Sequence, residues 1–139
     1  MEKVNLQGTP RPHYLQEAEI DEGGHHLVGV VLFPSEDPSV GDRRDHVNVS
    51  HHLFAAWNAA HFLARNLVGS ARLWAREVSA KLHEVTLPDV PIRIEADLTI
   101  DRERGPRRWG HYQVSFWDES GQKLLAELNV RFVGEIIQQ

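Results

Sequence analysis

The 139-residue sequence contains no cysteine, and this absence excludes several kinds of chemistry. Disulfide bridges, thiol nucleophiles and thiolate metal sites all require cysteine, so a cytoplasmic location is the expectation. No stretch approaches the roughly 18 uninterrupted apolar residues of a membrane-spanning helix. The first residues, Met1 to Leu6, lack the apolar run of a signal peptide. We therefore do not expect a membrane protein.

Positive charge is also scarce: 15 lysines and arginines stand against 20 aspartates and glutamates, which gives a formal net charge of -5. A nucleic-acid partner is not expected, because binding phosphates requires a basic face. Two local arginine clusters remain, Arg43-Arg44 and the arginines between residues 102 and 108. Either is able to contact an acidic carrier or a phosphate, and the second is interpreted as solvated loop arginines.

Hydrophobic residues make up 41% of the sequence and charged residues 25%, which is typical of a globular protein. The length suits one hydrophobic core and is too short for two, so residues 1–139 are predicted to form a single domain. Segments 14–20 and 26–33 flank the turn-forming run Asp21-Glu22-Gly23-Gly24 and predict a hairpin.

Residues 49–67 contain no glycine or proline and are dense in alanine, leucine and aromatic residues, which predicts one long helix. Asn48 or Ser50 is expected as its N-cap and Gly69 as its stop signal. The predicted apolar face recurs every three to four residues. Its members are Val49, Leu53, Ala56, Ala60, Leu63 and Leu67, widened by Phe54, Trp57 and Phe62.

Residues 71–82 fit a strand that continues past a bulge toward Val85 and Leu87, with a helix as the alternative. Three further strands are predicted over residues 92–100, 110–117 and 124–133, joined by hairpin turns. The order is therefore two strands, a long helix and about four antiparallel strands. A curved sheet wrapped around the helix satisfies this order, because each offers the other its only large apolar surface.

Two motifs resemble the hotdog-fold acyl thioesterases, in the branch of the long-chain acyl-CoA thioesterase FcoT. His46-Val47-Asn48 before the helix, with Trp57-Asn58 about three turns later, is similar to the family's Gly-His-Phe-Asn and Phe-Asn motifs. The run 116–121, Phe-Trp-Asp-Glu-Ser-Gly, is similar to its Phe-Trp-Asp-Glu-Asn-Gly hairpin. The resemblance extends from Tyr14 to Val133 and implies an α+β hotdog fold.

The resemblance also implies an acyl thioester of coenzyme A or an acyl carrier protein as substrate, no cofactor, and at least a homodimer. Some members of this branch hydrolyse thioesters, whereas others add glycine to a 2-enoyl thioester and so build β-amino acid units of macrolactams or isonitrile lipids. The thioesterases have a tyrosine about six residues before the motif histidine, where this sequence has Val40. Tyr14 matches another family tyrosine and is expected to reach the pocket. Asp45 replaces the usual glycine.

The expected catalytic residues lie at the start of the helix. Backbone N–H groups near Asn48 carry partial positive charge and are suited to hold a thioester oxygen, with the Asn48 amide as a further donor. His46 is the expected base, because an ordinary histidine accepts protons near neutral pH. Arg43 and Arg44 are candidates for binding the glycine carboxylate, although both also suit a solvated loop.

Four other features have open interpretations. Phe54, Trp57 and Phe62 either line an acyl tunnel between helix and sheet or belong to the core. Asn58 requires a partner on a buried helix, either a backbone group or the substrate. The nine histidines include His51-His52, but adjacent helical side chains diverge by about 100 degrees, so no metal site is expected. His25, His26 and His83 are expected at the surface.

Glycine addition, with or without accompanying hydrolysis, is therefore the leading functional hypothesis. Simple acyl-CoA or acyl-carrier-protein hydrolysis is the first alternative. A non-catalytic acyl-binding module is the second, because a fold alone does not establish activity.

Overall fold

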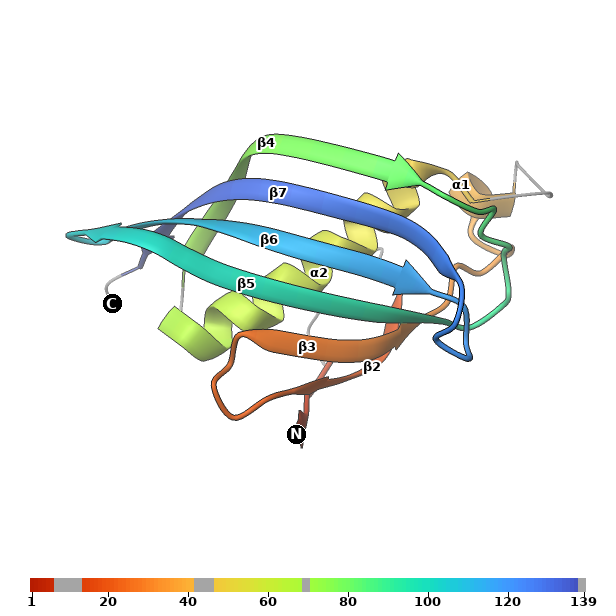
Figure 1. Cartoon of the computed structure of the whole chain (residues 1–139), viewed down its shortest axis with the longest axis horizontal. Helices are drawn as coiled ribbons and strands as arrows, with labels where there is room; N and C mark the ends of the chain where they lie inside the picture. Colours follow the sequence, from red (N-terminus) through yellow and green to blue (C-terminus); the bar gives the residue numbers. More distant parts are fainter. Residues whose placement is uncertain (7–13, 42–46, 69–70, 138–139) are drawn as a thin grey trace.

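The computed structural model describes residues 1–6, 14–41, 47–68 and 71–137. Its main feature is a seven-stranded sheet that curves around the long helix α2 (Figure 1). Neighbouring strands are antiparallel, in the order β1-β2-β3-β5-β6-β7-β4. The elements are β1 (Glu2–Lys3), β2 (Leu15–Ile20), β3 (His26–Val31), α1 (Pro38–Gly41), α2 (Val49–Val68), β4 (Ala71–Leu82), β5 (Ile92–Arg104), β6 (Arg107–Trp117) and β7 (Leu124–Ile136).

The three predicted hairpins are confirmed, and glycines form their turns. Gly24, Gly105 and Gly121 all have positive φ angles, of 75°, 57° and 75°, which side-chain-bearing residues adopt at a cost. Strands β5, β6 and β7 extend beyond the predicted ranges, because their ends continue to pair where the alternation of apolar residues has faded. The first hairpin is also fixed by the Asp21 carboxylate, which accepts hydrogen bonds from two backbone N–H groups.

The segment after the helix is a strand, as predicted, and not a helix. β4 pairs with β7 at one edge of the sheet. Its bulge, however, lies between Ala75 and Glu77 and not beyond Leu82. Val85 and Leu87 belong to the following loop and are exposed, so their apparent change of register does not reflect strand pairing.

Helix α2 agrees with its prediction within one residue at its C-terminal end. Asn48 directly precedes it and therefore takes the N-cap position, whereas Ser50 lies inside the first turn. Gly69 lies outside the described residues. The side of α2 that faces the sheet is rich in small residues, which let the helix approach closely. Its fully or nearly fully buried members include Ala55, Ala56, Ala59, Ala60 and Leu63.

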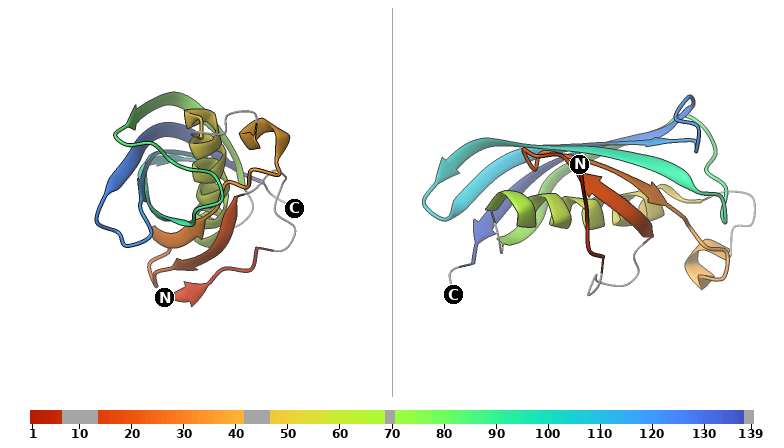
Figure 2. Two further views of the ribbon diagram at one scale, coloured as in Figure 1. Left: turned by 90° about the vertical axis from the view of Figure 1, so that its right-hand side faces the viewer. Right: turned by 90° about the horizontal axis from the view of Figure 1, so that it is seen from below.

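The core lies between α2 and the concave face of the sheet (Figure 2). Along β6 the buried residues Tyr112, Val114 and Phe116 alternate with more exposed ones, as expected for a strand with one covered face. No second layer of described elements covers the outer side of α2. No described helix is long and apolar enough to cross a membrane.

Candidate functional site

The start of α2 contains several buried polar contacts. The Asn48 carbonyl oxygen accepts a hydrogen bond from the His51 backbone N–H at 3.0 Å. One residue earlier, the Val47 N–H donates to the Thr86 carbonyl oxygen at 2.8 Å, which ties the helix entrance to the β4–β5 loop. Because the first N–H groups of a helix have no partner inside it, this entrance carries partial positive charge.

His52 connects these elements through its side chain. Its Nδ1 lies 3.1 Å from the Asn48 carbonyl oxygen, and its Nε2 lies 2.8 Å from the Thr86 hydroxyl. A carbonyl oxygen only accepts, so Nδ1 carries the hydrogen, and the Thr86 hydroxyl donates to Nε2. Burial lowers the pKa of His52 to about 4. The ring is therefore neutral near pH 7.

Tyr14 lies beside the first turn of α2. Its hydroxyl donates to the Asp37 carboxylate at 2.9 Å. Its ring lies 4.8 Å from that of Phe33 and 5.9 Å from that of His51, measured between centroids. Asp37 directly precedes α1, so this contact fixes α1 next to the helix entrance. Tyr14 is nearly fully buried.

The hairpin motif of residues 116–121 contacts the first turn of α2. The β6–β7 turn lies at the same end of the sheet as α1 and the start of α2 (Figure 1). The rings of Phe116 and His52 are edge to face, with centroids 5.0 Å apart. Asp118 organises the turn itself, since its carboxylate accepts from the Gln122 and Lys123 N–H groups. The hairpin motif therefore supports the first turn of α2 from the sheet side.

Four predicted site residues, Arg43, Arg44, Asp45 and His46, lie outside the described residues. Of the others, Asn48 directly precedes α2 and Tyr14 lies beside its first turn, whereas Trp57 and Asn58 lie further along the helix. Asn58 is buried, with 8% of its surface exposed.

Phe54 does not face the sheet, contrary to the expectation of a tunnel between helix and sheet. Its side chain is 52% exposed. The reason is the rotation of the helix. Phe54 is two residues after the buried His52, a turn of about 200 degrees around the helix axis, so its side chain projects outward. Trp57 lies toward the same side, half-buried, with its ring 5.8 Å from that of His61. Phe62 is on the inner side and is buried.

Sequence reasoning missed Thr86 and Asp37 and considered His52 only as a metal ligand. The one available signal was the spacing of Asn48 and His52, one helical turn apart, which lets a side chain reach the capping carbonyl. Thr86 is 34 positions from His52 in a loop without periodicity, so no sequence pattern pointed to their contact. Within the described ranges, no three histidine or acidic side chains gather closely enough to hold a metal ion.

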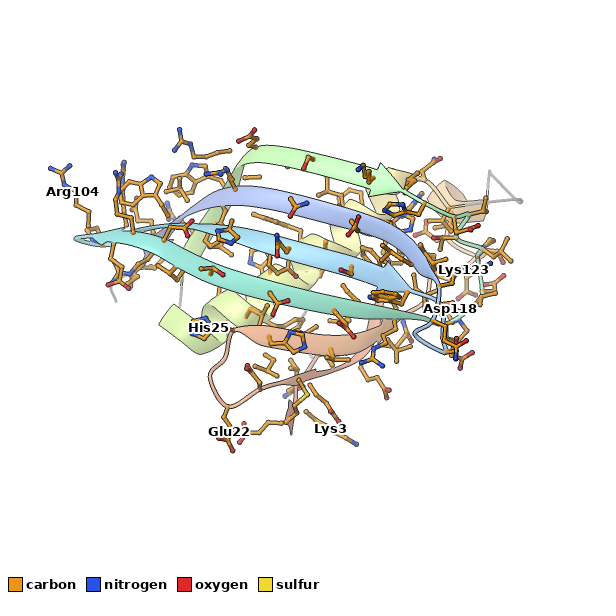
Figure 3. All side chains as sticks on the ribbon, in the orientation of Figure 1. Lys3, Glu22, His25, Arg104, Asp118 and Lys123 are labelled. Atoms are coloured by element: carbon orange, nitrogen blue, oxygen red, sulfur yellow. The ribbon has the colours of Figure 1, made fainter. Side chains whose placement is uncertain are left out.

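His83 and the second arginine cluster lie on other surfaces. His83 pairs with Glu127 at 2.9 Å at the surface, as predicted. Arg104 projects at the tip of the β5–β6 hairpin, at the opposite end of the sheet from Asp118 (Figure 3). Arg102 is not simply solvated, because its guanidinium lies 4.1 Å from the centroid of the Trp109 ring. This cluster is therefore remote from the start of α2.

A curved antiparallel sheet wrapped around one long helix is the hotdog fold, and this chain has it, as predicted. No family model and no curated protein matches the sequence. Solved structures do match.

Protein smu.793 from Streptococcus mutans UA159, bound to acetyl CoA, has a TM-score of 0.72 and 8% identity over 98% of this chain and 100% of its own. AziG from S. sahachiroi has a TM-score of 0.67 and 15% identity over 88% of this chain and 92% of its own. A hypothetical thioesterase from Streptococcus pneumoniae TIGR4, solved with coenzyme A, has a TM-score of 0.65 and 9% identity, covering 88% of each chain. These TM-scores show a shared fold.

Proposed function

We propose that this protein acts on 2-enoyl thioesters at the start of α2 and adds glycine to their double bond. The proposal rests on one observation: Asn48 occupies the N-cap position at the start of α2 and lies between buried polar partners. The fold supports the substrate class, because two structures that share it were solved with acetyl CoA or coenzyme A. The carrier in this case is coenzyme A or an acyl carrier protein.

The entrance of α2 supplies the polarising group. The thioester carbonyl oxygen accepts hydrogen bonds from backbone N–H groups of the first turn, assisted by the Asn48 amide. Withdrawing electron density from that carbonyl makes the β-carbon electrophilic. The same oxygen site stabilises the enolate formed by attack at the β-carbon and the tetrahedral intermediate formed by hydrolysis.

In the addition, the neutral glycine nitrogen attacks the β-carbon and forms a carbon–nitrogen bond. The π electrons of the double bond move toward the thioester oxygen as an enolate. His46 accepts a proton from the nitrogen and returns it to the α-carbon. Arg43 or Arg44 binds the glycine carboxylate. The product is a β-amino acyl thioester in which the thioester bond is intact.

Val40 favours addition over hydrolysis. It is 1% exposed within α1, at the position where the similar thioesterases have a tyrosine. An aliphatic side chain cannot orient a water molecule, so a hydrolytic step loses that assistance. The nearby Tyr14 hydroxyl already donates to Asp37. Simple hydrolysis and non-catalytic acyl binding are the alternative functions.

A homodimer formed through β4 belongs to the same proposal. β4 is a sheet edge of 12 residues without glycine or proline, a form that natural proteins usually cover. Val78 and Leu82 pair with the buried Val130 and Ala126 and so project from the concave face, yet they are 44% and 54% exposed. Phe54 on α2 is exposed as well.

The sequence of β4 is complementary to itself. An antiparallel pairing of two β4 strands centred on Ser79 places Glu77 opposite the partner's Lys81, on both sides of the two-fold axis. It also places Val78 opposite the partner's Ala80. Light scattering should therefore give twice the chain mass of 15.9 kDa. Glu77→Lys should weaken the dimer, and Glu77→Lys combined with Lys81→Glu should restore it; a monomeric wild-type protein would contradict the proposal.

The activity is tested by incubating the protein with a 2-enoyl thioester, with and without glycine, and separating the products by mass. A glycine adduct supports addition, free acid supports hydrolysis, and an unchanged thioester that still binds supports an acyl-binding module. His46→Ala should abolish turnover while leaving the circular dichroism spectrum unchanged. Arg43→Ala and Arg44→Ala should raise the KM for glycine only; unchanged values would place the carboxylate site elsewhere.

A further inference from the structure

The side-chain contacts of His52 suggest a role that the proposed reaction does not yet include. The ring is 1% exposed and lies between Phe33 and Phe116, with centroid distances of 5.3 and 5.0 Å. A phenylalanine would satisfy that packing. His52 instead directs both ring nitrogens to polar groups that border the entrance of α2, the Asn48 carbonyl and the Thr86 hydroxyl.

We propose that His52 and Thr86 are positioning residues that fix the oxygen-binding site at the start of α2. The inference rests on the proposed function, which places the thioester oxygen there. Neither residue needs to touch the substrate. Each acts through the backbone on one side of Asn48: His52 through the Asn48 carbonyl, and Thr86 through its own carbonyl, which accepts from the Val47 N–H at 2.8 Å.

The planarity of the peptide group explains how a contact to a carbonyl can aim a donor. The Asn48 carbonyl and the Val49 N–H belong to one peptide plane and point in opposite directions in the trans form. The His51 N–H and His52 Nδ1 both hold that carbonyl toward the helix, at 3.0 and 3.1 Å. The Val49 N–H therefore points away from the helix body, toward the site where the oxygen would bind.

Thr86 completes the arrangement because it bonds one residue on each side of Asn48, His52 and Val47. Its hydroxyl donates to His52 Nε2, and that bond requires the ring to be neutral with its hydrogen on Nδ1. The same tautomer is the one able to donate to Asn48. Removing the Thr86 hydroxyl therefore frees the ring to turn, although the fold keeps its packing. Thr86 is itself buried, at 3% exposure, so no solvent readily replaces it.

Matched variants separate positioning from packing. Thr86→Val keeps the shape and removes the hydroxyl, and His52→Phe keeps the aromatic packing and removes both hydrogen bonds. We expect each to lower kcat for adduct formation about ten- to hundredfold, with KM nearly unchanged, because a small misplacement near the reacting atoms has effects of that size. Thr86→Ser should restore most of the rate. Folded variants with wild-type kcat would overturn the proposal.

Two measurements do not depend on turnover. Nitrogen NMR of the ring should show the Nδ1–H tautomer of His52, and finding Nε2–H would overturn the proposal. A saturated acyl thioester labelled with ¹³C at its carbonyl should show a downfield carbonyl shift on binding to the wild type and a smaller one with Thr86→Val. If the shift behaves in this way while no adduct forms, the positioning role stands and glycine addition fails. If adduct forms but the shift is equal in both proteins, the positioning role fails alone.

Discussion

The chain's two tyrosines provide a matched test of its core, because replacing each with phenylalanine should change stability in opposite directions. Tyr112 is 0% exposed between Leu98 and Val130 on the concave face of the sheet. Its hydroxyl has no hydrogen-bond partner among the described residues, and burial raises the pKa of this phenol well above its ordinary value. Tyr14 is equally buried, but its hydroxyl donates to a carboxylate.

A buried polar group without a partner costs about 1–3 kcal/mol, whereas a hydrogen bond to a charged group contributes about 1.5–3 kcal/mol. Tyr112→Phe should therefore stabilise the fold by about 1 kcal/mol. Tyr14→Phe should destabilise it by about 1.5 kcal/mol. For a chain of 139 residues, these changes correspond to a melting temperature about 3 °C higher and about 5 °C lower, respectively.

Urea unfolding followed by circular dichroism measures both changes, with the thermal midpoint as a second observable. Equal slopes of the free energy of unfolding against urea concentration would show that the two variants unfold from the same compact state. A loss of 1 kcal/mol or more in Tyr112→Phe would refute the reasoning, because it would show that the Tyr112 hydroxyl is bonded in solution, for example to a buried water molecule.

Two further predictions concern pH and a glycine. Burial lowers the pKa of His52 from 6.5 to about 4, so the folded state favours the neutral ring. This ring therefore causes no loss of stability above about pH 6.5. As the pH falls from about 6.5 to about 4, the free energy of unfolding should decrease by about 3 kcal/mol. His52→Phe should lack that dependence in urea titrations. Gly110→Ala should destabilise by more than about 2 kcal/mol, because its Cβ would meet the Thr99 carbonyl oxygen and would lie 2.6 Å from Phe132 Cζ. Gly105→Ala, with open space but a φ of 57°, should cost only about 1 kcal/mol; equal losses in urea unfolding would contradict the steric argument.

The elements that could be predicted from sequence are those with a long repeating pattern. The 20 residues of α2 repeat often enough to define its type, and the alternating residues of β5 define both its type and its buried face. β1 and α1, with two and four residues, are too short for any periodicity to appear. Phe54 shows the limit of composition, since a wide apolar stripe on a helix does not tell which of its edges remains exposed.

The residues of the candidate site also differ in whether the sequence could predict them. Asn48 was identifiable because a capping residue at a polar-to-apolar boundary has a local signature. The contact of His52 with Thr86 was not, since it depends on how the β4–β5 loop returns to the start of α2, a long-range consequence of sheet topology. Tyr14 and Asp37, 23 positions apart, meet for the same reason.

The central claim is most directly tested by mass analysis of the thioester fraction after incubation of the wild-type protein with a 2-enoyl thioester and isotopically labelled glycine. The account predicts labelled β-amino acyl thioester that forms only with active protein and disappears in His46→Ala. An unchanged enoyl thioester, without label and without free acid, would contradict it.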